Sequence, residues 1–453
     1  MTSLQTRLDE HLKAHLYVTG GASKSLAIRL QEAEFLFLVY TPRDANTEAL
    51  VAELTDAVAA QEKRRRPRGP KERQALEEAV AAVVGGVLLS ALRRGKMVLK
   101  SRREEAFRGH VGYSAAIAAI DGLAVTGFLL HHSGIRFERQ DAFNDVTAWA
   151  GWASRYEASD ALIHLAASYG INKETVKRSF GTRFPLKAEV AKTPMVLKQF
   201  ESDGGASLSI PRSDQTHKQL KADVQLANRL LAAASWSSNC QPPALFRTFR
   251  DDWTFGGRWI VSGEASIQRM AAEDRLEILI DGQAVAEIDA RGSQLSIVAA
   301  IAGVQAILGD PYQIGALAAF ERDVVKAALT ATLGTGTLRK TWPKDMKHDE
   351  AVSMPKIRDA LVSAHPYLRD LSKLLGVPSD RVSLRLQNIE AQCLTHAMRT
   401  LWAEGTPVVP MHDGLLVPVA AAGMAEVALR EGYRAVAGAI IQTTQSVGGG
   451  AAA

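Results

Sequence analysis

The sequence predicts an α+β protein, with a helical N-terminal half and a C-terminal half in which strands and helices alternate. The chain has 453 residues, of which 47% are hydrophobic and 23% are charged. This is the balance of a globular protein long enough to form two or three domains. Helical patterns dominate up to about residue 235, where Trp236–Pro243 (WSSNCQPP) breaks them. Beyond this break, apolar runs of strand length separate the helices.

The composition excludes several classes of protein. Two cysteines, Cys240 and Cys393, supply neither a disulfide framework nor a four-cysteine zinc site, and they suit a reducing compartment. The uncharged apolar run Ala79–Leu92 has 14 residues, fewer than the roughly 18 that a membrane span needs. The first residues, MTSLQTRLDEHLK, lack the apolar core of a signal peptide. We therefore expect a soluble cytoplasmic protein with no membrane partner.

Residues 1–150 are expected to form a mostly helical N-terminal domain with a basic segment. Ala33–Tyr40 (AEFLFLVY) has the length of a strand, and proline and glycine make Glu62–Arg73 (EKRRRPRGPKER) a loop. From Lys63 to Arg108, 14 lysines and arginines face 5 glutamates, so this segment carries +9 and the rest of the chain −4. Such a block favours a polyanion such as nucleic acid, although a solvated connection between helices is the commoner explanation of a charge run.

The next region, 151–235, is expected to be helical and thumb-like. Within it, Asp160–Phe180 (DALIHLAASYGINKETVKRSF) has the pattern of a helix-turn-helix, in which Gly170 makes the turn and Asn172 caps a second helix. A polar, basic second helix of this kind can enter the major groove of DNA. Its nucleic-acid-binding candidates are Lys173, Lys177 and Arg178. An ordinary pair of packed helices gives the same pattern, and the sequence favours neither alternative.

Two aspartates in the C-terminal half stand where strands end. Asp289 closes the apolar segment Ala284–Asp289 (AVAEID), and Asp413 lies between two apolar segments of Pro407–Val417 (PVVPMHDGLLV), a strand–turn–strand signature. Carboxylates on adjacent strands could hold two Mg²⁺ ions about 4 Å apart, as phosphoryl- and nucleotidyl-transfer sites do. Each aspartate taken alone is more simply a strand terminator.

Between these aspartates lie two cations at helical spacing. Arg322 and Lys326 occupy positions i and i+4, which share one face of a helix. Two cations one turn apart suit a triphosphate that approaches a metal site. A solvated helix face is the simpler alternative.

In this order, the segments from about 236 to 435 resemble the A-family DNA polymerases and their relatives, the single-subunit phage RNA polymerases. Nothing in 1–150 shares the resemblance. The segments that carry it are Gly256-Gly257-Arg258, Asp289–Leu295 (DARGSQL), Arg322 with Lys326, Gln387–Met398 (QNIEAQCLTHAM) and His412-Asp413, which resemble in turn the family's T-G-R, D-Y-S-Q-I-E-L, fingers-helix, Q-G-T-A-A-D and H-D motifs.

The resemblance implies a palm at 236–445, made of an antiparallel sheet with helices, and a small helical fingers insertion at about 304–384. It implies two Mg²⁺ ions, or Mn²⁺, held by Asp289, Asp413 and the backbone carbonyl of Ala290. Gln294, Arg322 and Lys326 would bind the nucleoside triphosphate. Arg258, Gln387 and His412 would contact primer or template.

The sequence departs from the family where the sugar and the triphosphate are bound. Gln294 stands where the family has a glutamate that blocks a ribose 2′-hydroxyl. Thr330 and Gly334 stand where the family has an aromatic residue and a tyrosine after the fingers lysine. These changes leave the choice between dNTPs and NTPs open. The N-terminal half has no acidic cluster arranged like a proofreading exonuclease, and none is expected.

The sequence therefore predicts a template-directed DNA polymerase that adds nucleotides to a primer–template DNA. DNA replication, as of a mobile element, DNA repair and defence remain open as its pathway. Three alternatives remain. They are a primase or RNA polymerase that uses NTPs, a non-catalytic helix-turn-helix protein with a decayed palm, and a two-metal nuclease. The glycine- and alanine-rich residues 446–453 are expected to be a disordered tail.

Overall fold

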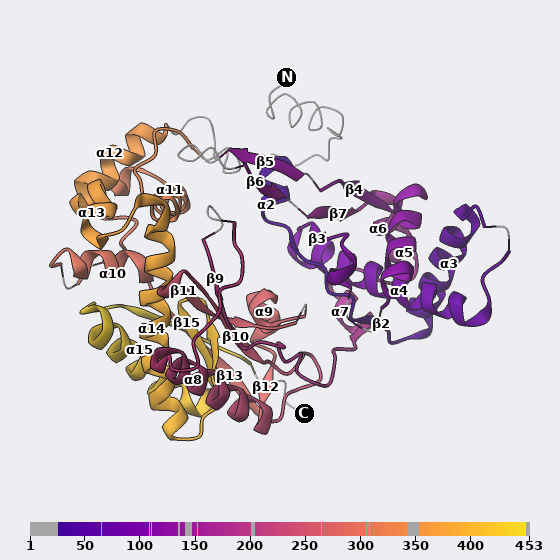
Figure 1. The fold of residues 1–453 in the computed structure, drawn as a ribbon. Helices are drawn as coiled ribbons and strands as arrows, with labels where there is room; N and C mark the ends of the chain where they lie inside the picture. Colours follow the sequence, from indigo (N-terminus) through magenta and orange to yellow (C-terminus); the bar gives the residue numbers. More distant parts are fainter. Residues whose placement is uncertain are drawn as a thin grey trace.

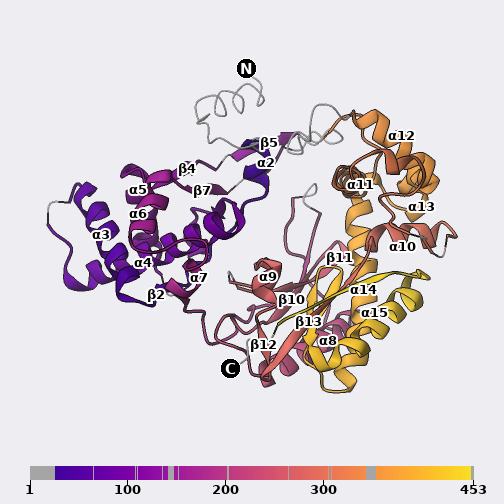
Figure 2. The same cartoon turned by 180° about the vertical axis from the view of Figure 1, so that it is seen from behind.

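A computed structural model describes residues 26–449, apart from 65, 108, 110, 135, 141–146, 152, 201–203, 264, 305, 308 and 343–352. The chain forms two lobes that lie side by side, each with its own hydrophobic core (Figures 1 and 2). We call residues 26–182 the N-terminal lobe and residues 195–449 the C-terminal lobe. Helices and several sheets occur in both, so the predicted α+β class is confirmed.

The N-terminal lobe packs helices against a four-stranded sheet with the order β1-β3-β7-β4. Its elements are α2 (Leu26–Gln31), β1 (Glu34–Phe35), β2 (Tyr40–Pro42), α3 (Ala45–Gln61), α4 (Pro70–Leu89), the π-helical turn η1 (Ser90–Arg94), β3 (Val98–Lys100), η2 (Glu104–Ala106), α5 (Tyr113–Val125), β4 (Leu129–His132), β5 (Arg136–Gln140), β6 (Thr147–Gly151), β7 (Ser154–Ala158), α6 (Asp160–Ser168), α7 (Val176–Ser179) and β8 (Phe180–Thr182). Helices predominate, as predicted, but most of these strands have too little hydrophobic alternation to be recognised in the sequence.

Helix α4 runs through the middle of this lobe. Together with η1 it forms one helix, Pro70–Arg94, that is long and apolar enough to cross a membrane by length and composition. However, 72% of its most apolar window is buried inside the lobe. Gly85 and Gly86 explain part of this packing, because a Cβ there would lie 2.5 Å from side-chain atoms of Tyr40 and Leu36, respectively. These contacts are those of a central core helix.

The C-terminal lobe is built on two sheets. A three-stranded sheet has the order β11-β10-β9, and a five-stranded sheet has the order β12-β13-β15-β14 with β16 on β13. Its elements are β9 (Met195–Lys198), α8 (Gln215–Ala233), β10 (Leu245–Arg250), β11 (Asp252–Val261), η4 (Ile267–Arg269), α9 (Ala272–Arg275), β12 (Leu279–Ile280), β13 (Gln283–Ala290), α10 (Ser293–Ile301), η5 (Gly315–Ala319), α11 (Arg322–Thr335), α12 (Met354–Ala364), η6 (Pro366–Asp370), α13 (Leu371–Leu375), η7 (Ser379–Arg381), α14 (Val382–Ala403), β14 (Val409–Met411), β15 (Gly414–Pro418), η8 (Val419–Ala421), α15 (Ala422–Ala437) and β16 (Thr443–Val447).

The long helices α14 and α15 pack on each other beside these sheets (Figure 1). Helices α10 to α13 lie between β13 and α14, and α11 to α13 fall within 304–384, the range of the predicted helical insertion. The insertion therefore separates Asp289 from Asp413 in the chain, while the sheet holds their strands side by side.

The two cores divide the chain at a different place from the predicted boundaries near 150 and 235. Strand β7 is central in the N-terminal sheet, whereas Met195, Leu197 and Val224 belong to the core of the C-terminal lobe. Hence 151–235 is not a separate helical region. The buried residues of β7 are Ser154, Tyr156 and Ala158, a pattern that hydropathy does not mark as a strand.

The helix-turn-helix expected at 160–180 is incomplete. The first helix, the turn at Gly170 and the cap made by Asn172 are present. The second helix, α7, has four residues because Phe180 already enters strand β8, which pairs with β2. A helix this short gives no recognition helix for a major groove.

Residues 446–449 are ordered and do not belong to a disordered tail as predicted. Ser446 and Val447 complete β16, paired with Glu287 and Ala286 of β13. The next residue, Gly448, donates its amide hydrogen to the carbonyl of Val285 at 2.8 Å, and a Cβ at Gly448 would lie 2.0 Å from a backbone oxygen. Glycine here permits a close approach of two backbones, which low-complexity composition does not reveal. The tail residues from 450 onward lie outside the described residues.

Candidate active site

Strands β13 and β15 bring the two predicted aspartates to one end of the sheet. In their antiparallel register Asp289 pairs with Gly414, the residue after Asp413. The amide of Ala290 donates to the carbonyl oxygen of Asp413 at 3.3 Å. The register therefore brings two aspartates that are far apart in the sequence to the same strand end, where the charge of Asp289 acts on the pKa of Asp413.

The hairpin between β14 and β15 leaves no room for a larger residue beside Asp289. His412 adopts a left-handed backbone conformation with φ of 56°, which makes the two-residue turn. A Cβ on Gly414 would lie 2.3 Å from Oδ1 of Asp289. The sequence His-Asp-Gly thus has a steric explanation in addition to a chemical one.

Both carboxyl groups are partly removed from water. Burial, followed by the negative charges of Glu390 and Asp289, raises the pKa of Asp413 to about 7. Burial and the charge of Glu287, opposed by Arg275, raise the pKa of Asp289 to about 6. Carboxyl groups with strongly raised pKa values mark a candidate functional site.

Glu390 is the main residue that the sequence analysis did not single out. It lies on α14, is 2% exposed, and its Oε1 accepts a hydrogen bond from Ser293 at 2.6 Å. Its Oε2 accepts from Arg258 at 3.0 Å and from Gln294 at 3.4 Å. Glu390 therefore joins β11, α10 and α14 next to Asp413. The signal that could have found it is a glutamate inside Gln387–Met398, a segment quoted for a motif.

The paired glycines before Arg258 have a steric role. Gly256 and Gly257 have φ values of 69° and 74° at an irregularity in the pairing of β10 with β11. A Cβ on Gly257 would lie 2.2 Å from the ring of Phe249. The bend they allow directs Arg258 to Glu390, so the predicted primer–template arginine is anchored in an ion pair in this structure.

The other predicted nucleic-acid contacts lie around the same carboxylates. Gln387 is on α14, one turn before Glu390, where it donates to the hydroxyl of Ser383 at 3.2 Å. His412 is exposed in the hairpin turn. Partial desolvation and then the charge of Arg258 lower its pKa. Neutral imidazole is therefore favoured at physiological pH.

A second buried ion pair lies beside Asp289 on β13. Arg275 of α9 donates to both carboxylate oxygens of Glu287, at 2.7 and 3.0 Å from one nitrogen. Glu287 is 6% exposed. Because residues i and i+2 of a strand share a face, Glu287 and Asp289 lie on the same side of β13. Glu287 is thus engaged by an arginine, whereas Asp289 has no ion-pair partner among the described residues.

Arg322 and Lys326 lie on one face of α11, as their spacing predicted. Arg322 is held by Asp310 through an Nε–Oδ2 contact of 2.7 Å and lies 4.8 Å above the ring of Tyr312. The charges of Asp413 and Arg322 both act on the pKa of Tyr312. Tyr312 therefore lies within electrostatic reach of both. Lys326 is exposed.

The donor set suits a hard divalent cation. Mg²⁺ is commonly held by one or two carboxylates, and water or substrate phosphates complete its six ligands. Asp289 and Asp413 provide two such carboxylates, while Glu287 and Glu390 are occupied by arginines. Among the described residues no group of three or more His, Cys, Asp or Glu side chains converges. The residues fit a cation that keeps part of its water or shares a substrate.

Much of the predicted basic segment is neutralised within the protein. Several of its cations form ion pairs, namely Arg64 and Arg68 with Glu62, Arg73 with Asp56, Arg102 with Asp121, and Arg94 and Lys96 with Glu34. Lys177, predicted to contact nucleic acid, pairs instead with Glu277 of the C-terminal lobe. The neighbouring Lys173 and Arg178 are exposed and have no ion pair within the described part of the chain.

Comparison with solved structures gives several matches, one of which is to a polymerase domain. The chain is similar to a solved structure described as the POL domain of Pol1 from M. smegmatis in complex with DNA primer-template and dNTP. The match has 11% sequence identity and a TM-score of 0.29, and it covers 92% of this chain and 67% of the other. The TM-score is too low for residues of the two chains to be equated one by one. No family model matches the chain, and no curated protein matches it in sequence.

Proposed function

We propose that the chain is a template-directed nucleotidyltransferase, with its reaction centre at Asp289 and Asp413. The observation that supports this most strongly is the register of β13 and β15, which pairs Asp289 with Gly414 and so places the two aspartates at one strand end. In the proposed reaction, the 3′-hydroxyl of a primer attacks the α-phosphate of a nucleoside triphosphate and pyrophosphate leaves. A DNA primer–template with dNTPs is the first candidate substrate, and NTPs are the alternative.

Asp289, Asp413 and the backbone carbonyl of Ala290 would hold divalent cations, with Mg²⁺ preferred and Mn²⁺ able to replace it. When bound, such ions stabilise charge on the attacking and leaving oxygens of an in-line displacement. The desolvation that raises the pKa of Asp413 to about 7 makes its carboxylate depend on a cation at neutral pH.

Arg322 and Lys326 would bind the triphosphate. The Nε of Arg322 already contacts Asp310, which fixes the guanidinium over Tyr312. Its Nη1 lies 4.0 Å from Asp323, so Nη2 is the nitrogen that would bind a phosphate. Lys326 adds a second exposed cation one turn later on the same face. Gln294 would lie near the sugar, since its amide is directed to Glu390 beside Asp413.

Arg258, Gln387 and His412 would contact primer or template around the same carboxylates. In the N-terminal lobe the exposed Lys173 and Arg178 remain candidates for phosphate contacts, and Lys177 is a candidate only if its pair with Glu277 opens.

Primer extension tests the proposal. A labelled primer–template is incubated with Mg²⁺ in parallel reactions that contain dNTPs, NTPs, or dNTPs without template. We expect templated extension by the wild-type protein and a loss of at least about 100-fold in Asp289→Asn and in Asp413→Asn, because charge stabilisation of several kcal/mol is removed. Asp359→Asn is the matched control, since Asp359 is an exposed aspartate on α12 that pairs with its neighbour Arg358.

The sugar that supports extension identifies the substrate class. Extension that persists at the wild-type rate in both active-site variants would contradict the proposal. Salt-dependent nucleic-acid binding with no extension by the folded wild-type protein would favour the non-catalytic alternative.

A further inference from the structure

The two lobes meet through one short apolar segment, Leu36–Tyr40. Leu36 and Leu38 belong to the core of the N-terminal lobe, whereas Val39 belongs to the core of the C-terminal lobe and Phe37 packs against it. Alternate side chains of an extended segment point in opposite directions. The segment therefore lies between the two cores and joins them.

A pocket that is partly open to solvent lies beside this segment. It has a volume of about 390 Å³ and is lined by Phe37 and Val39, by Phe107 and Val111 of the N-terminal lobe, and by Glu189 of the connection between lobes. Side chains of the two lobes do not fill this space, so a movement of the lobes breaks fewer atom contacts there than at a filled interface.

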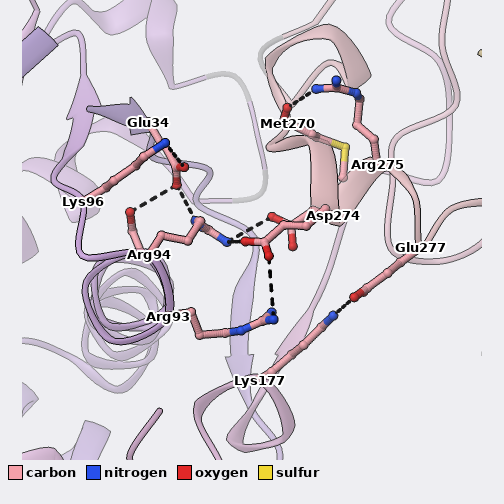
Figure 3. Close-up of polar contacts among 11 residues, drawn as sticks. Glu34, Arg93, Arg94, Lys96, Lys177, Met270, Asp274, Arg275 and Glu277 are labelled. Carbon is pink, nitrogen blue, oxygen red and sulfur yellow. Dashed lines mark hydrogen bonds and ion pairs between the residues drawn. The ribbon is translucent and has the colours of Figure 1, made fainter. Parts of the chain in front are cut away.

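A cluster of charges makes the second contact between the lobes (Figure 3). Arg94 of η1 pairs with Glu34 in its own lobe at 2.6 Å and with Glu273 and Asp274 in the C-terminal lobe at 3.0 and 3.5 Å. Lys177 pairs with Glu277. We call the pairs that cross between lobes, made by Arg93, Arg94 and Lys177 with Glu273, Asp274 and Glu277, the ionic latch.

The acidic side of the ionic latch is firmly attached to the C-terminal lobe. Glu273 and Asp274 lie on α9, and the next residue, Arg275, forms the buried bidentate pair with Glu287 of β13. Arg275 also donates to the carbonyl of Met270, so both ends of α9 are fixed. The residues that contact the N-terminal lobe, Glu273 and Asp274, are therefore held next to β13, the strand that carries Asp289.

The outer pair of the ionic latch is weaker than the contacts behind it, whereas Arg94 at the centre of the latch is 13% exposed and also has Glu34 as a partner in its own lobe. The side chains of Lys177 and Glu277 are each 44% exposed and Glu273 is 46% exposed, whereas Arg275 and Glu287 are 13% and 8% exposed. Exposed pairs contribute little to stability and are screened by salt, but removal of one partner of a buried pair is strongly destabilising. An opening between the lobes would therefore break the latch and leave α9 on β13.

We propose that the N-terminal lobe turns on the C-terminal lobe about Leu36–Tyr40. The arrangement in this structure is the closed position, and the ionic latch holds it reversibly. The latch thereby sets the position of the N-terminal lobe relative to Asp289, and its strength depends on charge and ionic strength. It follows from the packing of the lobes and does not depend on the reaction proposed for the site.

The distance between spin labels on the two lobes tests this proposal. Asn46→Cys on α3 and Thr400→Cys on α14 provide exposed attachment sites. The two natural cysteines, Cys240 and Cys393, are buried, and burial raises their thiol pKa, so labels do not compete for them. The distance distribution is measured by electron spin resonance at 50 mM and 500 mM salt.

The test uses Lys177→Glu, Glu277→Lys and the double variant, which exchanges the two charges. Each single variant is expected to raise the ratio of open to closed molecules about 1.4- to 5-fold, the range for an exposed pair. The double variant should return most of the way to wild type, and high salt should raise the ratio in wild type. Lys173→Glu, a charge reversal at a nearby exposed lysine without an ion-pair partner in the described residues, is the control and should have no effect.

One distance distribution shared by wild type and both single variants at both salt concentrations would overturn the proposal. The proposal would also be overturned if the single variants open and the double variant stays equally open. The closed position would then not depend on the pairing of these two charges. Lys177 and Glu277 are exposed, so none of these variants is expected to unfold either lobe.

Discussion

Asp413 and Asp289 are the residues on which the proposed chemistry depends, and their surroundings make both carboxylates costly to ionise. Asp413 lies next to the buried Glu390, and Asp289 shares a strand face with Glu287. Each neighbouring glutamate has an arginine partner, whereas neither aspartate has an ion-pair partner among the described residues. A divalent cation would relieve their repulsion and their desolvation together.

The pH dependence of stability should report this arrangement. Without metal, the folded protein keeps protons on Asp289 and Asp413 up to pKa values of about 6 and 7, whereas the unfolded chain releases them near 3.8. The folded state therefore binds more protons between these values, and its stability from this source falls as pH rises from about 4 through 7. We expect the melting temperature in EDTA to fall less steeply with pH in Asp413→Asn than in wild type.

Addition of Mg²⁺ should have the opposite pH dependence. Carboxylates bind the ion in their deprotonated form, so the increase in melting temperature on adding Mg²⁺ should be larger at pH 8 than at pH 5.5. The same slope for wild type and Asp413→Asn in EDTA would show that this carboxyl group is not desolvated as described.

At the scale of elements, the fixed unit is β13 together with α9. The buried pair of Arg275 and Glu287 joins them. Glu287→Gln leaves Arg275 buried without its counter-charge, and we expect a loss of about 3–5 kcal/mol in the free energy of unfolding of the C-terminal lobe. Glu277→Gln breaks an exposed pair nearby and should cost less than about 1 kcal/mol. Urea unfolding followed by tryptophan fluorescence measures both, and equal losses would contradict the difference in burial.

The sequence predicts elements well where the signal is local. The strand ending at Asp289 and the turn at His412-Asp413 follow from short apolar runs and turn residues, and both are present. Glu390 was missed because its burial depends on contacts with Ser293 of α10 and Arg258 of β11, which a helical pattern alone does not contain. The prediction of a full second helix after Gly170 was wrong for a similar reason. Phe180 belongs to strand β8, which pairs with β2, and this pairing ends the helix.

At the scale of the whole molecule, the two separate cores predict two separate unfolding events. Leu88 is fully buried in the N-terminal core, and Leu88→Ala should cost about 2–5 kcal/mol there. Leu394 on α14 is its counterpart in the C-terminal core. Calorimetry should show that each variant lowers one transition and leaves the other nearly unchanged. A single transition that moves as a whole in both variants would contradict two independent cores.

The division into lobes was harder to predict than the elements. The sequence placed a basic segment and a helical region in the first half, but it did not show that Arg93, Arg94 and Lys177 face acids more than 90 residues later. Such ion pairs form only where the two folded lobes contact each other, and neither composition nor hydrophobic periodicity predicts which surfaces make that contact. The strand β16 is a comparable case, because its glycine-rich end fits the backbone of β13 only once the sheet exists.

Binding of Mn²⁺, measured by electron spin resonance, tests most directly whether Asp289 and Asp413 form one cation site. We expect saturable binding by wild type that Mg²⁺ competes away, and an affinity at least about tenfold lower in Asp289→Asn and in Asp413→Asn, because each removes one of two charged ligands. Glu277→Gln, at an exposed glutamate of the ionic latch, should bind as wild type does. Equal Mn²⁺ affinity in wild type and both aspartate variants would contradict the shared site and the nucleotidyl transfer proposed for it.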